Sequence, residues 1–589
     1  MTLRIRALRI AFGRSHRRAA ARCGAMAAAA LAFAASATSA SAGEFPTTVK
    51  ITSCPSVSIA GFIGDFPQPG AAAGQMRQFL GVPYAAPPVG ANRWNAPQPF
   101  CPAVHTLKTK AFANRCPQPE SAFGVASSTE DCLYLNIFTP VESGKYPVMV
   151  WLHGGGLTVQ ETGDYNPIEL VNRGVIVVTI EYRLGALGFL AHPALDDVSV
   201  GNTGNYGIED QQAALKWVKE NIAAFGGEPT KVTVFGQSAG GISTLVHLVS
   251  PKSAGLFSGA IIHSGVLRVP LTDLAPLSTA ESAGVNFANA VGCSTAACLR
   301  GLSVSTILAN QGAIDYPGFG GPLPNIDNFV LTDTVQNLLA SGTFNKVPVI
   351  NGTNHDEWRL NLPASGFGTL TTSGPHRGNF ADSLTPDALA ASQHGIGYTQ
   401  ALSDLGFSNA AIGQIESVYP GGSTDAAANT ALTAVVTDKN FACSAIHADS
   451  LIAQANVPIF AYEFNDERAP QNFYGPMTTL DGKNFPFGAF HIAELQYLFP
   501  ISNPTGVGFD LNKKPLDAAQ ATLATAMATY WTTFAKTGNP NPKPNPSKLA
   551  NWPTFSHAAL LSLVPATPTT ETAASFNSAH HCSFWAPDE

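Results

Sequence analysis

Long apolar runs, internal repeats and low-complexity linkers are all missing from this sequence of 589 residues. After residue 42, no stretch approaches the about 18 uninterrupted apolar residues of a transmembrane helix, so we expect no membrane span. Length alone suggests roughly three or four domains. Because nothing divides the chain, we predict a single domain over residues 43–589.

Motifs for metals and cofactors are missing as well. The sequence contains no Cys-x-x-Cys, and its 14 histidines do not follow the spacing of metal ligands. It also contains no signature of a cofactor-binding site. We therefore predict that the protein uses neither a metal nor a cofactor.

Acidic residues are absent from residues 1–42, which carry seven arginines. An apolar stretch from about Ala25 to Ala35 follows, and Ala40-Ser41-Ala42 fits a small-residue cleavage site. We predict a signal peptide over residues 1–42 and a secreted or periplasmic protein. The Arg17-Arg18 pair leaves twin-arginine export open beside the general route.

Loss of the signal peptide would shift the net charge from −7 to −14, because the segment holds seven positive and no negative charges. Proteins that bind nucleic acids present basic surfaces to the phosphates. So acidic a chain is a poor candidate for that class of partner. The sequence leaves the oligomeric state open.

Cysteines are few but even in number in the expected mature chain. Cys23 falls inside the signal peptide, which leaves eight. An even count in an exported chain favours disulfides over metal ligation, although roughly a hundred pairings stay open. The eight are Cys54, Cys101, Cys116, Cys132, Cys293, Cys298, Cys443 and Cys582.

Strand-like runs recur along the chain with helical segments between them, which predicts a doubly wound, mainly parallel sheet. Asp210–Phe225 has helical periodicity. Residues 310–327 and 366–382 are rich in turn-forming residues, and we expect them to be surface excursions. The strand-like runs are Pro147–His153, Val175–Tyr182, Lys231–Gln237, Ala260–His263, Val347–Asn351 and Ile459–Phe464.

The most informative segment is Gly236-Gln237-Ser238-Ala239-Gly240, which lies between a β-branched run and a helical stretch. Strand, Gly-x-Ser-x-Gly and helix in this order predict a nucleophile elbow, a tight turn that exposes the serine hydroxyl. The five-residue pattern is weak evidence alone, since a glycine-rich turn with a solvated serine also fits it. The context carries the prediction.

A second glycine cluster supports this prediction. A buried strand runs into His153-Gly-Gly-Gly156, where the missing side chains let main-chain N–H groups approach a substrate oxygen. In hydrolases with an elbow, such a loop and the residue after the serine form the oxyanion hole. Each donor there is worth about 3–4 kcal/mol of transition-state stabilisation.

A nucleophilic serine needs a base, and the base needs an orienting carboxylate. In α/β-hydrolases the chain order is Ser, then Asp or Glu, then His. Asp356 and Glu357 follow a predicted strand, and the residues alone leave both open as the acid. The histidines downstream are His376, His394, His447, His491, His557, His580 and His581; position favours His491.

The chain resembles the type-B carboxylesterase/lipase family of α/β-hydrolases. Besides the elbow and the His-Gly-Gly-Gly loop, the matching motifs are Phe79-Leu-Gly-Val-Pro-Tyr-Ala-Ala-Pro-Pro-Val-Gly90, Glu130-Asp-Cys-Leu-Tyr-Leu-Asn136, Tyr182-Arg-Leu-Gly185, Phe225-Gly-Gly227, Trp531-Thr-Thr-Phe-Ala-Lys-Thr-Gly538 and Cys582-Ser-Phe-Trp585. The resemblance covers nearly all of the expected mature chain. It implies the α/β-hydrolase fold, with a large, mostly parallel sheet, helices on both faces and insertions around the mouth of the site.

The resemblance also implies roles for individual residues. Ser238 would be the nucleophile, Glu357 the acid and His491 the base, while Trp358 replaces the glycine of the family's Asp-Glu-Gly motif. The N–H groups of Gly155, Gly156 and Ala239 would form the oxyanion hole. Implied ion pairs are Arg93 with Glu130 and Arg183 with Glu228. Implied disulfides are Cys116–Cys132, Cys293–Cys298 and Cys443–Cys582, which leaves Cys54 and Cys101 to pair with each other.

Two departures from relatives bear on the substrate. Gln237 stands where cholinesterase-like members have Glu, and the 15 residues between Cys116 and Cys132 contain no Trp or Tyr to bind a quaternary ammonium group. The same loop is much shorter than the lid of the family's lipases. We expect a serine carboxylesterase that acts on small to medium ester substrates. A lipase or polyester hydrolase, or a non-catalytic binding protein on this fold, are the alternatives.

Overall fold

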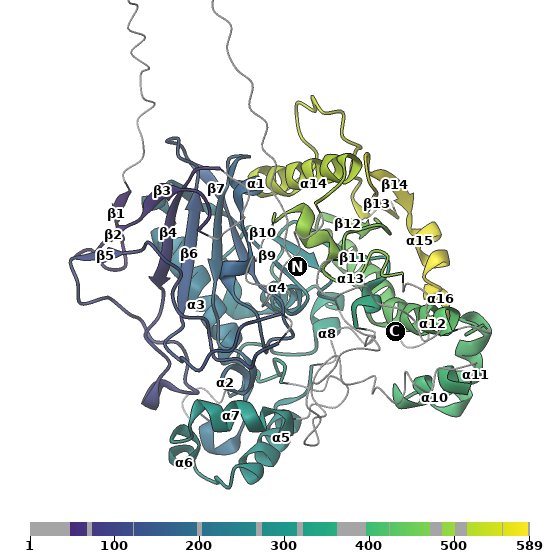
Figure 1. Cartoon of the computed structure of the whole chain (residues 1–589), viewed down its shortest axis with the longest axis horizontal. Coiled ribbons are helices and arrows are strands. Elements are labelled where there is room, and N and C mark those ends of the chain that lie inside the picture. The colour runs from purple at the N-terminus through teal and green to yellow at the C-terminus, as the bar shows by residue number, and fades with distance from the viewer. Residues whose placement is uncertain are drawn as a thin grey trace, which may run out of the picture. The chain divides into compact units, whose positions relative to one another are not determined.

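The computed structural model places eleven strands in one large sheet, in the order β14-β13-β12-β11-β10-β9-β7-β8-β6-β4-β3 (Figure 1). The seven strands from β13 to β8 run parallel, and the pairs at both edges are antiparallel. Their bounds are β3 Phe62–Gly64, β4 Met76–Pro83, β6 Tyr134–Thr139, β7 Tyr146–Leu152, β8 Ile176–Ile180, β9 Gly227–Gln237, β10 Gly259–His263, β11 Val349–Asn354, β12 Ile459–Phe464, β13 Ala559–Leu563 and β14 Thr569–Thr572. A second sheet joins β1 (Thr48–Lys50), β2 (Ser58–Ala60) and β5 (Thr106–Lys108).

The structure describes residues 47–586 except 68–73, 122, 197–202, 267–273, 315–321, 362–395, 423–424, 472–485, 501–514 and 556–557. All of them belong to one compact unit, Gly43–Glu589. The predicted signal peptide, the predicted excursion 366–382 and the candidate bases His376, His394 and His557 lie outside these residues.

The predicted mostly parallel sheet is confirmed, and each of the six strand-like runs overlaps a strand of it. The predicted helix is also present, as α3 (Tyr206–Asn221) continued by a 3₁₀ turn, Ile222–Phe225. It begins four residues earlier than predicted, since Tyr206 to Glu209 are buried in its first turn.

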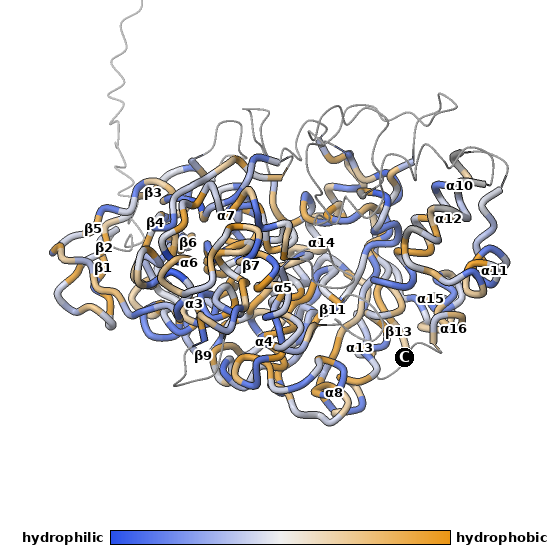
Figure 2. Tube along the Cα trace, turned by 90° about the horizontal axis from the view of Figure 1, so that it is seen from below, coloured by the Kyte–Doolittle hydropathy of each residue, from blue (hydrophilic) through white to orange (hydrophobic). Residues whose placement is uncertain are grey.

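Both faces of the sheet are buried. Along β7, Val148, Val150 and Leu152 belong to one hydrophobic core, whereas Met149 and Trp151 belong to another, as the two-residue period of a strand requires. Helices α3, α4 (Ala239–Val249) and α13 (Cys443–Gln454) contribute to the first core. Helices α1 (Ile168–Val171) and α14 (Ala518–Thr537) contribute to the second, and Figure 2 shows hydrophobic residues gathered in the strands and in helices such as α4.

The remaining helices lie mainly toward the margins in Figure 1. A smaller core unites α2, α5, α6 and α7. The bounds are α2 Gly185–Phe189, α5 Leu277–Ala290, α6 Ala296–Arg300, α7 Val304–Asn310, α8 Val335–Ala340, α10 Ile396–Asp404, α11 Asn409–Val418, α12 Asp425–Thr437, α15 Ala573–Ala579 and α16 Cys582–Trp585.

The prediction that residues 310–327 form a surface excursion is wrong for their last part. Leu323, Asn325 and Asp327 are buried. Asn325 and Asn205 each accept a hydrogen bond of 2.9 Å from the other, through Asn205 Oδ1 and the Asn325 carbonyl. These bonds satisfy the polar backbone that would otherwise need solvent.

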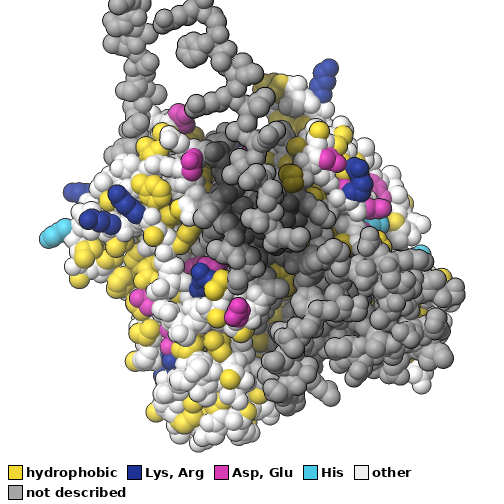
Figure 3. Space-filling view, in the orientation of Figure 1, with side chains coloured by type: hydrophobic (Ala, Val, Ile, Leu, Met, Phe, Trp, Pro, Cys, Tyr) yellow, Lys and Arg dark blue, Asp and Glu magenta, His cyan; other side chains and the backbone are white. Residues whose placement is uncertain are grey.

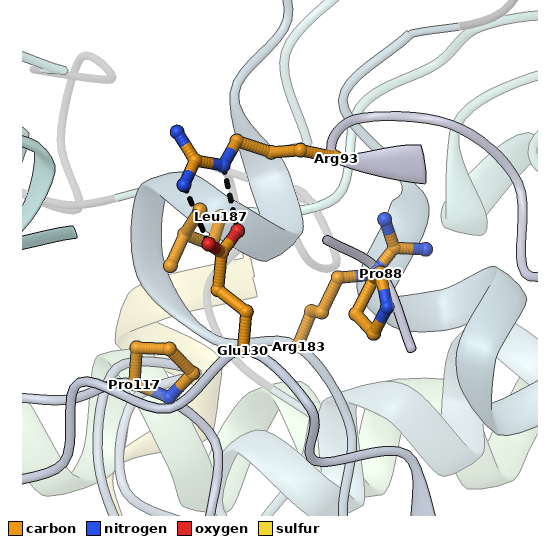
Figure 4. Close-up of a pocket in the computed structure, with 6 residues that line it drawn as sticks. All are labelled: Pro88, Arg93, Pro117, Glu130, Arg183 and Leu187. Carbon is orange, nitrogen blue, oxygen red and sulfur yellow. Dashed lines mark hydrogen bonds and ion pairs between the residues drawn. The ribbon is translucent and has the colours of Figure 1, made fainter. Parts of the chain in front are cut away.

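Of the two expected ion pairs, one is confirmed and one is wrong. Arg93 forms a two-pronged pair with Glu130, at 2.6 and 2.5 Å (Figure 4). Arg183 instead forms a buried pair with Asp210, with Nε 2.7 Å from Oδ2, whereas Glu228 lies 3.5 Å from the Nζ of Lys231.

Strand direction explains the error. Arg183 follows the carboxyl end of β8, and Glu228 lies at the amino end of β9. Both strands run parallel to β7, so the carboxyl end of β8 and the amino end of β9 lie at opposite ends of the strands.

The eight described cysteines form four disulfides: Cys54–Cys101, Cys116–Cys132, Cys293–Cys298 and Cys443–Cys582. These are the expected pairs. Of the helices in the described ranges, none is both long and apolar enough to cross a bilayer. On the face shown in Figure 3, charged side chains are few and scattered, in keeping with a sequence of 12% charged residues.

Candidate active site

Ser238 sits in the tight turn between β9 and α4. Its backbone has φ 56° and ψ −122°, a conformation that costs a non-glycine residue strain and that persists only where the surroundings enforce it. A Cβ on Gly236 would lie 2.4 Å from the carbonyl oxygen of Gly240, and one on Gly240 would lie 2.0 Å from that of Leu152. Both glycines are therefore sterically required, as a nucleophile elbow predicts.

The glycine loop after β7 lies against this turn. A Cβ placed on Gly154 would be 3.3 Å from the Cβ of Ser238. Gly155 and Gly156 have φ of +87° and +62°, and a Cβ on Gly155 would lie 2.2 Å from the carbonyl oxygen of Val159. Only glycine fits that position, so the loop keeps a shape that brings its backbone close to the serine.

Three main-chain N–H groups beside Ser238 have no hydrogen-bond acceptor among the described residues. Within the described residues, the N–H groups of Gly155, Gly156 and Ala239 donate to no acceptor. Ala239 is also the first residue of α4, where the helix dipole favours negative charge. The arrangement can therefore stabilise an anionic oxygen beside Ser238.

His153, the first residue of the glycine loop, is buried and uncharged. The ring of His153 stacks on Tyr182 with centroids 4.4 Å apart, and the Tyr182 hydroxyl donates to the His153 carbonyl at 2.7 Å. Burial lowers the pKa of His153 to about 4. Burial also raises the pKa of the nearby Glu181 to about 8, with the negative charge of Glu161 adding to the effect. Near neutral pH, His153 therefore adds no charge beside the loop.

Glu357 and His491 are in direct contact. His491 Nδ1 lies 2.5 Å from Glu357 Oε2, and the His491 amide donates to the Glu357 carbonyl at 3.1 Å. Glu357 is fully buried, and its Oε1 accepts from the Thr353 hydroxyl and the Asn354 amide, both at 2.8 Å. These bonds fix the carboxylate and thereby the imidazole ring.

Asp356, the other acid that the sequence left open, lies elsewhere. Its Oδ1 is 2.8 Å from Arg359 Nη2, and its Oδ2 accepts from the Ala489 amide at 2.9 Å. Of the two neighbouring carboxylates, only Glu357 contacts the imidazole of His491.

The far side of the His491 ring faces the elbow. Gln237, the residue before Ser238, has its Nε2 3.1 Å from His491 Nε2. With a carboxylate at Nδ1, the neutral ring carries its proton on Nδ1, so Nε2 is an acceptor and the Gln237 amide is the donor. Ser238 Oγ itself has no hydrogen-bond partner among the described residues.

Other histidines in the described ranges are engaged elsewhere. His580 contacts Asp438 and Glu463, and the ring of His581 lies 4.9 Å from that of Tyr419. His447 lies on α13. Of the candidate bases that the structure describes, His491 is the one that it brings to the elbow.

An aromatic wall beside His491 escaped the sequence analysis. The ring of Phe441 lies 5.5 Å from the imidazole, and the ring of Trp358 lies 6.2 Å from Phe441. The Trp358 amide donates to Thr437 Oγ1 at 3.0 Å. Trp358 could have been found, because it replaces a glycine next to the predicted acid. Phe441 carried no such signal, since it comes from a distant π-helical turn, Asp438–Ala442.

The chain is similar to known proteins over most of its length. Residues 57–585 match the model of a family described as the carboxylesterase family. The chain is 34% identical to mouse acylcarnitine hydrolase, over 81% of each chain, and 33% identical to fumonisin B1 esterase of Sphingopyxis macrogoltabida, over 82% of each. It is 32% identical to mouse cholinesterase, over 82% of this chain and 78% of the relative.

Proposed function

Because the chain belongs to the carboxylesterase family, whose members have the α/β-hydrolase fold, we propose that Ser238, His491 and Glu357 are the catalytic triad of this carboxylic ester hydrolase. The observation that carries the proposal is the line of contacts from the buried Glu357 through His491 to the elbow.

In the first step, His491 Nε2 takes the proton of Ser238 Oγ as the oxygen attacks the ester carbonyl carbon. The carbonyl oxygen becomes an oxyanion that the N–H groups of Gly155, Gly156 and Ala239 can bind. The C–O bond to the alcohol then breaks, the proton passes from His491 to the leaving alcohol, and the acyl group stays on Ser238.

In the second step, water replaces the alcohol. His491 removes a proton from the water, which attacks the acyl carbon, and the carboxylic acid leaves as Ser238 regains its proton. Glu357 keeps the Nδ1–H of His491 in place and stabilises the imidazolium in both steps. Only a neutral imidazole can accept the proton, so protonation of His491 would stop turnover.

The contact between Gln237 and His491 has to break before the first step. The Gln237 amide occupies the nitrogen of His491 that the serine hydroxyl must reach. Catalytic hydrogen bonds are often long or incomplete without substrate and tighten when it binds. A bound ester would bring Ser238 Oγ to His491 Nε2 and turn the Gln237 side chain away.

We propose small to medium, soluble carboxylic esters as substrates. The cysteine loop over residues 117–131 is short and holds no Trp or Tyr, which argues against a lipase lid and against choline esters as preferred substrates. We also propose that the protein acts outside the cytoplasm, which the basic, apolar residues 1–42 and the four disulfides support.

Ser238→Ala tests the nucleophile. The wild type should hydrolyse p-nitrophenyl esters and react covalently with a fluorophosphonate probe, and the variant should do neither while keeping its melting temperature. Ser264→Ala, which changes a buried serine shortly after β10, is the control and should still react with the probe. Labelling of the Ser238→Ala variant at the wild-type rate would refute the assignment.

A further inference from the structure

Four distant segments bring two imidazoles and two carboxylates together away from Ser238. His355 follows β11, Glu463 lies in β12, His580 follows α15, and Asp438 begins the π-helical turn. β11 and β12 are parallel neighbours, with Thr353 opposite Glu463, so His355 and Glu463 both lie near the carboxyl ends of these strands. The chain spacing of these residues shows no metal motif, and only the fold unites them.

Three nitrogen and oxygen atoms of this cluster converge on one point. Glu463 Oε1 lies 2.7 Å from His355 Nδ1 and 2.7 Å from His580 Nε2, and all three atoms are within 4.8 Å of one another. Zinc binds imidazole nitrogen and carboxylate oxygen at about 2.0–2.2 Å, which places the ligands of one ion about 3–4 Å apart. Small side-chain movements would therefore suffice to admit an ion.

The ligands are oriented from behind, as metal ligands in proteins are. His580 turns its second nitrogen, Nδ1, to Asp438 Oδ1 at 2.6 Å. Glu463 Oε2 accepts from Asn465 Nδ2 at 3.2 Å. A carboxylate behind a ligating histidine fixes the ring and its tautomer, and such outer partners commonly change metal affinity 10–100-fold, roughly.

A polar cavity opens beside the cluster. Its volume is about 130 Å³, and its lining includes His355, His580, Asp356, Asp438, Arg359 and Tyr419. A single water needs about 10–15 Å³ of such space, so the cavity has room for water as a further ligand. The His355 side chain is 30% exposed, which gives an ion a way in.

The charges around this cavity favour a dication. Asp356 and Asp438 line the cavity, Glu463 contacts His355 and His580 beside it, and Arg359 pairs with Asp356. In the metal-bound form both imidazoles would be neutral, as ligands must be, and Asp356, Asp438, Glu463 and Arg359 would together carry a net charge of −2. One divalent ion would neutralise it.

We propose that His355, Glu463 and His580 bind one divalent transition-metal ion of the zinc class, with water as the fourth ligand. Two imidazoles and a carboxylate suit zinc, cobalt and nickel, whereas magnesium and calcium prefer all-oxygen sites. The ion links the end of α15, near Cys582, to the carboxyl ends of β11 and β12, and Glu357 follows β11. The site is independent of the proposed ester hydrolysis, and its role is to stabilise the folded chain.

Metal binding to the purified, disulfide-bonded protein tests this site directly. After dialysis against a chelator, calorimetric titration with ZnCl₂ should show one ion per chain, and CoCl₂ should give the intense visible absorption of four-coordinate cobalt, which Zn²⁺ then removes. Zn²⁺ should raise the melting temperature by a few degrees, and Mg²⁺ should not.

His355→Ala should weaken Zn²⁺ binding at least tenfold and abolish the cobalt spectrum. His581→Ala is the matched control, because His581 lines the same cavity without being one of the converging ligands, and it should bind as the wild type does. If His355→Ala does not fold by circular dichroism, His355→Gln, which keeps a donor toward Glu463, replaces it. Absence of stoichiometric binding by the wild type, or unchanged affinity in the folded His355 variant, would overturn the proposal.

Discussion

At the scale of single residues, Gln237 and Glu357 contact the two ring nitrogens of His491. Glu357 contacts Nδ1 at 2.5 Å and Gln237 contacts Nε2 at 3.1 Å, so the ring of His491 is fixed in one orientation. The residue beside the proposed nucleophile is thus part of the electrostatic surroundings of the proposed base, although the sequence motif leaves it variable.

Gln237→Glu should shift the pH dependence of turnover. A carboxylate beside Nε2 stabilises the imidazolium, whereas attack needs the neutral ring, so the acidic limb of the kcat/KM profile should move to higher pH by about one unit. Gln237→Met, of similar size but uncharged, should leave the limb in place. A limb that does not move in the Glu variant would show that this side chain does not act on His491.

The turn around Ser238 could be predicted because its geometry requires glycine at fixed positions, and glycines are visible in the sequence. Gly155, Gly236 and Gly240 lie where a Cβ would collide with a carbonyl oxygen, so the pattern is readable. The partner of Arg183 could not be read in the same way, since Asp210 and Glu228 are both acids and only strand direction separates them.

At the scale of elements, the loop after β7 is the part on which the proposed oxyanion hole depends. Gly155→Ala should reduce kcat by roughly a hundredfold or more, because a methyl group 2.2 Å from the Val159 carbonyl displaces the donors. Gly90→Ala is the control for backbone strain, as Gly90 has φ +57° with nothing within 4 Å of its Cβ. The control should lose some stability and no activity. Equal kinetic effects in both variants would remove the loop from the mechanism.

Helix α13 carries an acid that works against folding near neutral pH. Burial raises the pKa of Asp449 to about 8, despite a hydrogen bond of 2.8 Å from Asn351, whereas an unfolded Asp titrates near about 4. The folded state therefore holds the proton more tightly, and this group lowers the unfolding free energy as pH rises from about 4 to 8, by at most about 1.4 kcal/mol per pH unit.

Asp449→Asn should remove this contribution. The fall in melting temperature between pH 5 and pH 8 should be smaller in the variant than in the wild type, because an amide stays neutral throughout. Thermal unfolding followed at several pH values measures the difference. Parallel curves for the two proteins would mean that Asp449 is not protonated in the folded state.

The six predicted strands and their mainly parallel sheet could be predicted from the sequence, because buried parallel strands are continuous apolar runs. The order of the strands in the sheet was not predicted. The aromatic wall did not follow, since Phe441 reaches His491 from a segment 50 residues earlier in the chain. The buried end of segment 310–327 also escaped prediction, because the backbone of Asn325 is satisfied by Asn205, far away in sequence.

At the scale of the whole molecule, the short cysteine loop predicts how the enzyme meets its substrate. Activity on soluble p-nitrophenyl esters should fall with increasing acyl length, and activity on triolein should not jump when the concentration passes the solubility limit. A family lipase with a long lid is the suitable control and should show the jump. Strong interfacial activation of this protein would contradict the substrate class that we propose.

The spacing of residues in the sequence predicts no metal site, and the proposed cluster of His355, Glu463 and His580 illustrates what spacing cannot reveal. These residues are far apart in the chain and approach only when α15 packs against the carboxyl ends of β11 and β12. The residues of the proposed triad are dispersed in the same manner. These residues could be singled out from the sequence because each of them lies in a recognisable local motif.

At the same scale, the proposed mechanism requires an acyl-enzyme formed at Ser238 with His491 as base. Rapid mixing with a p-nitrophenyl ester, followed by acid quenching and peptide mass analysis, tests this most directly. We predict a burst of one p-nitrophenol per active chain and an acyl mass on the peptide that contains Ser238, both lost in His491→Ala. An acyl group found on another residue, or an undiminished burst without His491, would contradict this mechanism.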